Sequence, residues 1–151
     1  MTAAAGDWLV ADELAPDPNG ALAPLFERAA VGELVMPFCD HCSQPLELEQ
    51  FSCDACGGQV AWRRVDPSGT VHAVTTVHRR EPGLIRASDP YPVIDVELDS
   101  GHRVIMTTTR SVVEQPRIGQ PVALSFRTIG DVAVPAVAAP DPSHHDPEVA
   151  P

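Results

Sequence analysis

Lysine is missing from this sequence, and every one of its ten basic residues is an arginine. Asp and Glu together number 21, so the formal net charge is −11. A chain this acidic repels a phosphate backbone unless its few cations gather on one face. Aromatic residues make up only 5% of the sequence, so few side chains are available to stack on bases. Both shortages argue against nucleic-acid binding.

Long apolar stretches are also missing. No run approaches the roughly 18 apolar residues that a membrane-spanning helix needs. The N-terminal sequence MTAAAGDWLVADELAPDP lacks the basic start and the apolar core of a signal peptide. We therefore expect a cytoplasmic protein without a membrane segment, in a reducing environment that disfavours structural disulfides.

Cysteine is scarce, but its placement is informative. All four cysteines lie within CDHCSQPLELEQFSCDAC, as the pairs Cys39 and Cys42, and Cys53 and Cys56. Disulfides, a redox-active dithiol and a metal site are the alternatives. A redox Cys-x-x-Cys pair is expected once, near a βαβ pattern, whereas two such pairs separated by ten residues are typical of zinc sites. Four cysteines also fill a tetrahedral coordination sphere, so the predicted zinc is structural rather than catalytic.

Recognisable catalytic motifs are missing as well. The sequence contains no Gly-x-Ser-x-Gly, no phosphate-binding Gly-rich loop and no cysteine beyond the four predicted ligands. Some residues of the strand region are catalytic candidates by type alone: His72, His78, His102, Asp95, Glu97 and Asp99. The two-residue period of YPVIDVELD directs Ile94, Val96 and Leu98 inward and the intervening carboxylates outward. We therefore predict no catalytic residues in this chain.

One helix and several strands are expected. In NGALAPLFERAAVGEL, apolar residues recur at helical spacing between Asn19, a candidate N-cap, and Gly32, which predicts a helix over about residues 20–31. Pro24 suits only the first turn of such a helix. From Val60 onward, five or six short strands alternate with turns, including a hairpin at Asp99-Ser100-Gly101. This order favours a five-stranded Greek-key barrel. His144 and His145 lie in a Pro-rich acidic segment and are not expected to bind metal.

The order of these parts resembles a known family between about Leu22 and Val137. The most specific matches are Gly32-Glu33-Leu34, Trp62, Ser68-Gly69-Thr70-Val71, Thr76-Val77-His78-Arg79 with Pro82-Gly83, and Ile118-Gly119-Gln120-Pro121-Val122. They resemble the acyl-CoA-associated family, a domain of unknown function family 35 type, in which a rubredoxin-like zinc ribbon precedes an OB-fold barrel. Members are companions of thiolases, acyltransferases, hydroxymethylglutaryl-CoA pathway enzymes and steroid side-chain aldolases, and some are fused to enoyl-CoA hydratase domains.

The composition of the two ends and the resemblance together predict a mainly β fold with five parts. They are a flexible arm (1–18), a helix (19–34), a zinc ribbon (35–62), an OB-fold barrel (63–138) and a disordered tail (139–151). The resemblance also implies a non-catalytic subunit that binds a thiolase-like protein, and possible contact with an enoyl-CoA hydratase. Apolar side chains of the helix and arm are the expected interface anchors: Leu22, Leu25, Phe26 and Trp8. The alternative is that Leu22, Leu25 and Phe26 pack against the chain's own ribbon.

One departure from the family concerns the ligand. The family often carries Pro-Pro-Arg between the knuckles, where this chain has Leu48, Glu49 and Gln50, and Ser43 stands where a glycine is common. The lost positive charge moves the predicted CoA-phosphate contacts to arginines near and within the barrel: Arg63, Arg64, Arg79, Arg80 and Arg86. A free-standing acyl-CoA binding module is the second hypothesis, and a nucleic-acid-binding OB protein is the third.

Overall fold

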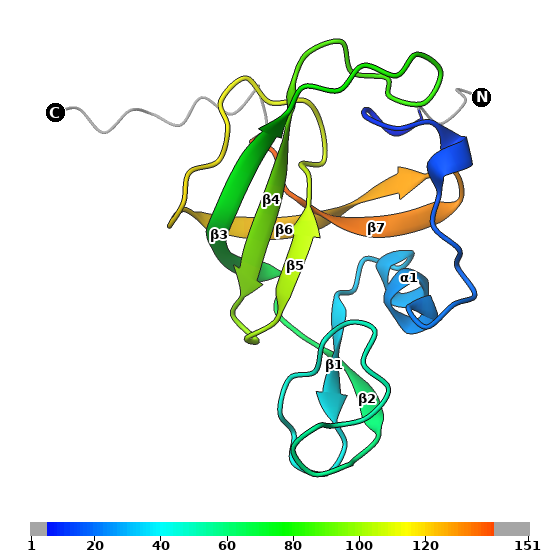
Figure 1. Cartoon of the computed structure of the whole chain (residues 1–151), viewed down its shortest axis with the longest axis vertical. Helices are drawn as coiled ribbons and strands as arrows, with labels where there is room; N and C mark the ends of the chain where they lie inside the picture. Colours follow the sequence, from blue (N-terminus) through cyan, green and yellow to red (C-terminus); the bar gives the residue numbers. More distant parts are fainter. Residues whose placement is uncertain (1–5, 141–151) are drawn as a thin grey trace, which may run out of the picture.

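The structure is a computed structural model that describes residues 6–140. Figure 1 shows a small two-stranded unit below a larger barrel, with one helix between them. The helical elements are η1 (Asp12–Leu14), a 3-10 turn, and α1 (Ala23–Ala29). The strands are β1 (Val35–Cys39), β2 (Val60–Arg64), β3 (Ser68–Val77), β4 (Tyr91–Leu98), β5 (Arg103–Met106), β6 (Pro121–Ile129) and β7 (Val132–Val137).

The larger sheet has the strand order β5-β4-β3-β6-β7, and all of its pairings are antiparallel. A parallel bridge between Thr108 and Val137 brings its two edges together, so the sheet is nearly closed. Strand β3 pairs with β4 along its length and with β6 at its start. This is the topology of an OB-fold. The predicted fold class is therefore confirmed: mainly β, with an N-terminal helix, a four-cysteine hairpin region and a five-stranded barrel.

The barrel core follows the alternation seen in the sequence. In β4, Ile94, Val96 and Leu98 are at most 2% exposed, while Glu97 is exposed. The same core also takes in Leu25 from α1 and Met36 from β1, so the helix and the first strand of the small unit pack against the barrel. Burial of apolar surface from three separate segments thus holds barrel, helix and β1 together.

Helix α1 is shorter than predicted. It begins after Leu22, which caps it without a side-chain hydrogen bond, so the prediction that Asn19 is the N-cap is wrong. Pro24 lies in the first turn, where its missing N–H costs nothing. At the other end, Gly32 adopts a φ of 80° and the Glu33 N–H bonds Arg28 O, which ends the helix as predicted. Phe26 is partly buried and packs against the barrel core, which agrees with the alternative that this helix face packs within the chain.

The predicted flexible arm is wrong for residues 6–15, because this segment contacts the barrel and its loops. Leu9 is 5% exposed, and Trp8 Nε1 donates to Thr108 O at 2.7 Å. The Trp8 side chain therefore contacts the chain's own barrel. Residues 1–5, most of the predicted tail, and with it His144 and His145, lie outside the described residues. No helix within residues 6–140 is long and apolar enough to cross a bilayer.

Candidate metal centre

The two cysteine pairs lie on matching turns in and next to the segment that connects β1 to β2. In the first turn, the Ser43 N–H bonds Cys39 O at 3.0 Å; in the second, the Gly57 N–H bonds Cys53 O at 2.8 Å. Ser43 has a φ of 62° and Gly57 one of 76°, so both are left-handed. This conformation explains why glycine is common at position 43, since serine adopts it less readily.

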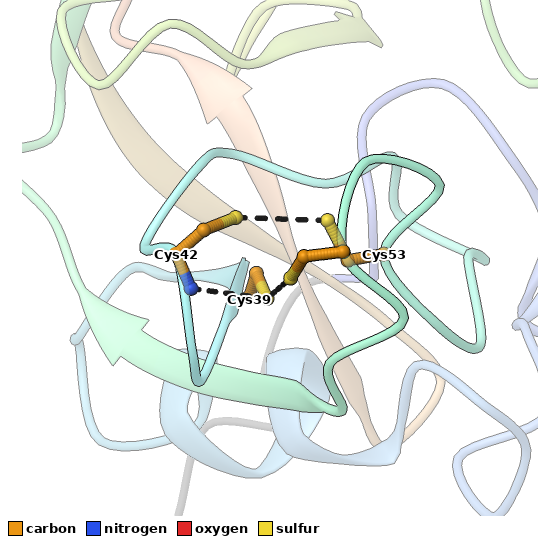
Figure 2. Close-up of side chains that lie close together, drawn as sticks. Cys39, Cys42 and Cys53 are labelled. Atoms are coloured by element: carbon orange, nitrogen blue, oxygen red, sulfur yellow. Dashed lines mark hydrogen bonds between the residues drawn. The ribbon is translucent and has the colours of Figure 1, made fainter.

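The turns bring all four sulfur atoms within 4.8 Å of one another. Figure 2 shows the Sγ atoms of Cys42 and Cys53 facing each other, 3.7 Å apart, and Cys39 Sγ lies 3.4 Å from that of Cys56. A tetrahedral zinc with Zn–S bonds of about 2.3 Å separates its sulfurs by about 3.8 Å. None of the four is in a disulfide. The chemistry and spacing of the donor set therefore fit a closed tetrahedral metal site.

Backbone N–H groups prepare one of the sulfurs for this role. The N–H groups of Cys42 and His41 both point at Cys39 Sγ, at 3.4 Å, and lower the pKa of that thiol to about 6. The Gly58 N–H favours the Cys56 thiolate, but the neighbouring Cys39 sulfur and desolvation outweigh it and raise the pKa of Cys56 to about 12. The pKa of Cys42 is also raised. The lowered pKa favours the thiolate at Cys39, whereas Cys42 and Cys56 would have to lose protons to bind a metal.

Gly58 is a residue that the sequence interpretation missed. A Cβ at this position would lie 2.5 Å from Cys39 Sγ, so any larger side chain would displace a ligand. The Gly57-Gly58 pair directly after the last cysteine was the available signal. Glycine is needed at the two positions for different reasons. Gly57 adopts the left-handed conformation of the turn, and Gly58 leaves room for the Cys39 sulfur.

His102 connects this hairpin to the barrel. Its ring is buried, with Nε2 2.7 Å from Pro37 O in β1 and Nδ1 2.7 Å from Ser100 Oγ. The ring also meets Phe38 edge-on, with centroids 4.9 Å apart. Both ring nitrogens of His102 contact structural partners. This residue, a catalytic candidate by residue type, therefore links the β1–β2 hairpin to the barrel.

The other candidates by type do not form a catalytic set. Asp95 pairs with Arg103, Asp99 accepts a hydrogen bond from Ser68 Oγ at 2.7 Å, and Glu97 is exposed. His72 is exposed at a β-bulge between Val71 and Ala73, and His78 is exposed beyond the end of β3. Among residues 6–140, the four cysteines are also the sole cluster of three or more potential metal ligands.

The five arginines predicted to contact CoA are not brought together. Arg63 and Arg64 lie on β2: Arg63 sits over the Phe38 ring at 5.5 Å, and Arg64 is 3.9 Å from Glu33. Arg86 donates to Asp7 O at 2.9 Å, on the N-terminal segment. Since β3 separates Arg64 from Arg79 by ten strand residues, or about 30 Å, these groups cannot grip one phosphate.

Arg79 and Arg80 remain as a pair. They line a hollow of about 350 Å³ with His78 and the segment 88–90, although Arg79 also pairs with Glu81. This hollow lies on the loop that joins β3 to β4. It is the one place where more than one of the five predicted arginines lines a hollow described for residues 6–140.

The outer face of β4 and β5 is the usual nucleic-acid surface of an OB-fold. Its half-buried or exposed side chains include Val93, Asp95 and Ile105, and neither strand contributes an exposed aromatic residue. The stacking that single-stranded nucleic acids need is therefore missing from this face of the described barrel.

Comparisons with known proteins agree with this architecture. Residues 62–127 match the family model described as the ChsH2 C-terminal OB-fold domain. A solved structure described as "Ltp2-ChsH2(DUF35) aldolase" is similar, with 24% identity and a TM-score of 0.70, over 82% of this chain and 98% of that chain. A DUF35-family protein of unknown function from Sulfolobus solfataricus is similar at 10% identity and a TM-score of 0.54, over 81% and 87%. No curated protein matches the chain. The resemblance predicted from the sequence is confirmed.

Proposed function

We propose that this chain, whose barrel matches the ChsH2-type OB-fold family, is a non-catalytic accessory subunit of a thiolase-like acyl-CoA enzyme. The observation that carries the proposal is the fold shared with a chain of an aldolase complex over 98% of that chain, together with the family match over residues 62–127. By the same resemblance, the partner belongs to lipid or steroid side-chain metabolism. The partner supplies the acyl-CoA chemistry, and this chain supports its assembly.

The side chains support a role without catalysis. A nucleophile needs a base within hydrogen-bonding reach, and the base needs an orienting group. The nearest approach to this arrangement is Ser100 beside His102, but the far nitrogen of His102 contacts Pro37 O and its ring is buried. The carboxylates of Asp95 and Asp99 are occupied by Arg103 and Ser68.

We further propose that the four-cysteine site holds one structural zinc. Bound zinc would supply cross-linking energy rather than chemistry, since four thiolates leave no coordination position for substrate. Cys39, Cys42, Cys53 and Cys56 would be its ligands, and their unpaired state favours a reducing compartment such as the cytoplasm. Metal analysis of the purified protein should give one zinc per chain. Much less than one zinc, with oxidised cysteine pairs, would contradict this assignment.

Contact with acyl-CoA is proposed for the Arg79–Arg80 hollow. Guanidinium groups suit phosphates, and this hollow has two of them beside His78. Arg63 and Arg86 have protein partners that explain them better, and Arg64 lies on β2, at the opposite end of β3 from this hollow. Replacing both Arg79 and Arg80 by alanine should weaken CoA binding to the complex, whereas Arg117→Ala, on another loop, should not.

Co-expression with a thiolase-like protein of the same organism tests the main proposal. We expect a stable complex on size-exclusion chromatography, whose acyl-CoA turnover depends on both subunits. The same experiment with an enoyl-CoA hydratase tests the additional partner. The second hypothesis, a free-standing acyl-CoA binding module, is favoured instead if the chain binds CoA tightly alone and stays monomeric beside every candidate partner.

A further inference from the structure

The N-terminal segment 6–15 runs beside residues 84–86 of the loop that joins β3 to β4, residues 78–90. Val10 pairs with Ile85 in an antiparallel bridge. On either side of it, the Ala11 N–H donates to Leu84 O at 2.8 Å and the Arg86 N–H donates to Leu9 O at 2.6 Å. Leu9 and Ala11 are buried beneath this pairing. The loop is thus held by backbone contacts from a segment about 75 residues earlier in the chain.

One carboxylate anchors this segment to the barrel. Asp7 accepts two hydrogen bonds from Arg127 on β6, Nε at 2.9 Å and Nη2 at 3.0 Å. It accepts two more from the N–H groups of Leu9 and Val10, at 3.1 and 2.9 Å. The side chains of Asp7 and Arg127 are only 1% and 11% exposed. Removal of the Asp7 charge would therefore leave a largely buried guanidinium without its partner, which is costly.

Arg86, which lies in the 78–90 loop, also binds segment 6–15. Its Nη1 donates to Asp7 O at 2.9 Å, and its Nη2 lies 3.5 Å from Asp12 Oδ1. A Cβ on Gly6 would lie 2.0 Å from Arg86 Nη1, so a side chain at this position would push the guanidinium out of its present place. Asp12 Oδ1 also accepts the Gly130 N–H, at 3.3 Å, from the turn between β6 and β7. Segment 6–15 therefore contacts both the 78–90 loop and the 130–131 turn.

These two connections correspond to the first and the last loop of an OB-fold, which in this fold flank the ligand-binding face. The 78–90 loop carries His78, Arg79 and Arg80 at one side of the segment 88–90. Trp8 and residues 86–92 line a second hollow, of about 210 Å³, on the other side. Figure 1 shows the N-terminal segment, in dark blue, lying beside the loop above β3 and β4.

We propose that residues 6–15 are a latch that holds the 78–90 loop in the conformation that forms both hollows. The latch adds little to the barrel core, whose buried cluster comes from other segments. It can therefore open locally, at a lower free energy than unfolding of the barrel. Opening frees the loop and disassembles both hollows. This inference rests on contacts within the chain and does not depend on the proposed partner or on acyl-CoA.

Hydrogen exchange on the full chain tests the latch. In Asp7→Asn, which keeps the shape and removes the charge, the Arg86 amide and the rest of the 78–90 loop should exchange about tenfold faster or more. The β3 and β4 amides should keep their protection. Asp17→Asn is the matched control, because Asp17 lies outside the latch and its described contact is with the neighbouring Asn19 N–H. Gly6→Ala, which disturbs Arg86 from the surface, should reproduce the effect in a second variant.

The fluorescence of Trp8 provides an independent measurement of latch opening. In a Trp62→Phe background Trp8 is the remaining tryptophan, and its emission should shift to the red in Asp7→Asn as the ring leaves Thr108 O. Unchanged loop exchange and unchanged Trp8 emission in both variants would overturn the proposal. Faster exchange spread evenly over β3 and β4 would also overturn it, because the segment would then be part of the barrel's cooperative unit.

Discussion

The hairpin formed by β1 and β2 and the barrel are both built from antiparallel strands, yet different forces hold them. The buried cluster at the hairpin's outer end consists of Cys39, Leu46 and Cys53, and two of these are candidate metal ligands. The barrel cluster is built around fully buried aliphatic side chains such as Ile94 and Val96. A segment with so little apolar surface to bury needs a metal or a covalent link, whereas the barrel does not.

The two regions are nevertheless continuous through β1. Leu34 and Met36, at or near its start, belong to the barrel core, and Cys39, at its end, belongs to the cysteine site. Between them, Pro37 O is the hydrogen-bond partner of His102 Nε2. This five-residue strand thus belongs to both regions. Trp62 of β2 and Leu48 also pack against the barrel core, so loss of the metal should reach the barrel through these contacts as well as through β1.

The largest expected effect comes from breaking the metal site. Cys53→Ser, or removal of metal by a chelator, should unfold residues 40–59 locally, because apparent zinc binding supplies about 10–16 kcal/mol in small zinc domains. Hydrogen exchange should rise sharply there, while the β3 and β4 amides stay protected. Ser52→Ala, beside the ligand, is the control and should keep full zinc content. Loss of protection throughout β3 and β4 would show that the barrel also depends on the metal.

The reciprocal experiment breaks the barrel core. Ile94 is 0% exposed, so Ile94→Ala should lower the free energy of unfolding by about 2–5 kcal/mol in a urea titration. Ile105, on the neighbouring strand, is 71% exposed, and Ile105→Ala should change it by less than about 0.5 kcal/mol. Zinc content should be unchanged in both folded variants. Equal costs for the two substitutions would contradict the assignment of inner and outer faces.

The protons released when the cysteine site binds metal provide a further test of how this site differs from the barrel. At pH 7 the pKa of Cys39, lowered to about 6 by the Cys42 and His41 N–H groups, leaves it mostly ionised. The raised pKa values of Cys42 and Cys56 mean that both must lose protons when metal binds. Apparent zinc affinity should therefore rise by at least about 100-fold per pH unit, since at least two protons are released. Calorimetry in two buffers of different ionisation enthalpy should count at least two protons; a count below one would refute this order of pKa values.

The smallest effect is expected at the junction. His102→Ala removes the contact with Pro37 O and should lower the stability of the metal-bound chain by about 1–3 kcal/mol. The same change in metal-free chain should cost less, since the hairpin is then already loosened. His72→Ala, at an exposed position, serves as the control and should be nearly neutral. Equal costs with and without metal would show that His102 stabilises the barrel alone.

The sequence predicted correctly those structural features that depend on residues close together in the chain. The cysteine spacing, the inward residues of β4 and the turn at Asp99-Ser100-Gly101 each depend on near neighbours, and each was predicted correctly. The packing of residues 6–15 was missed because Asp7 and Arg127 are 120 positions apart, and a single distant ion pair leaves no periodic signal.

The arginine prediction shows a second limit. Arg63, Arg64, Arg79 and Arg80 are close in the sequence, but an extended strand carries nearby residues far apart. Whether an arginine is available to a ligand also depends on its partners, such as Asp7 O for Arg86, which come from distant segments. Sequence proximity therefore identified the loop that carries the Arg79–Arg80 hollow but not the roles of the other three.

Turnover of an acyl-CoA thioester by reconstituted protein tests the account most directly. Thiolysis, hydrolysis and retro-aldol cleavage should be measured for this chain alone, for its thiolase-like partner alone, for the complex, and for the complex made with metal-stripped chain. The account predicts no turnover by the chain alone, full turnover by the complex, and loss of activity and assembly when the metal-stripped hairpin is used. Robust turnover by the isolated chain, abolished by a single substitution within it, would contradict a non-catalytic role.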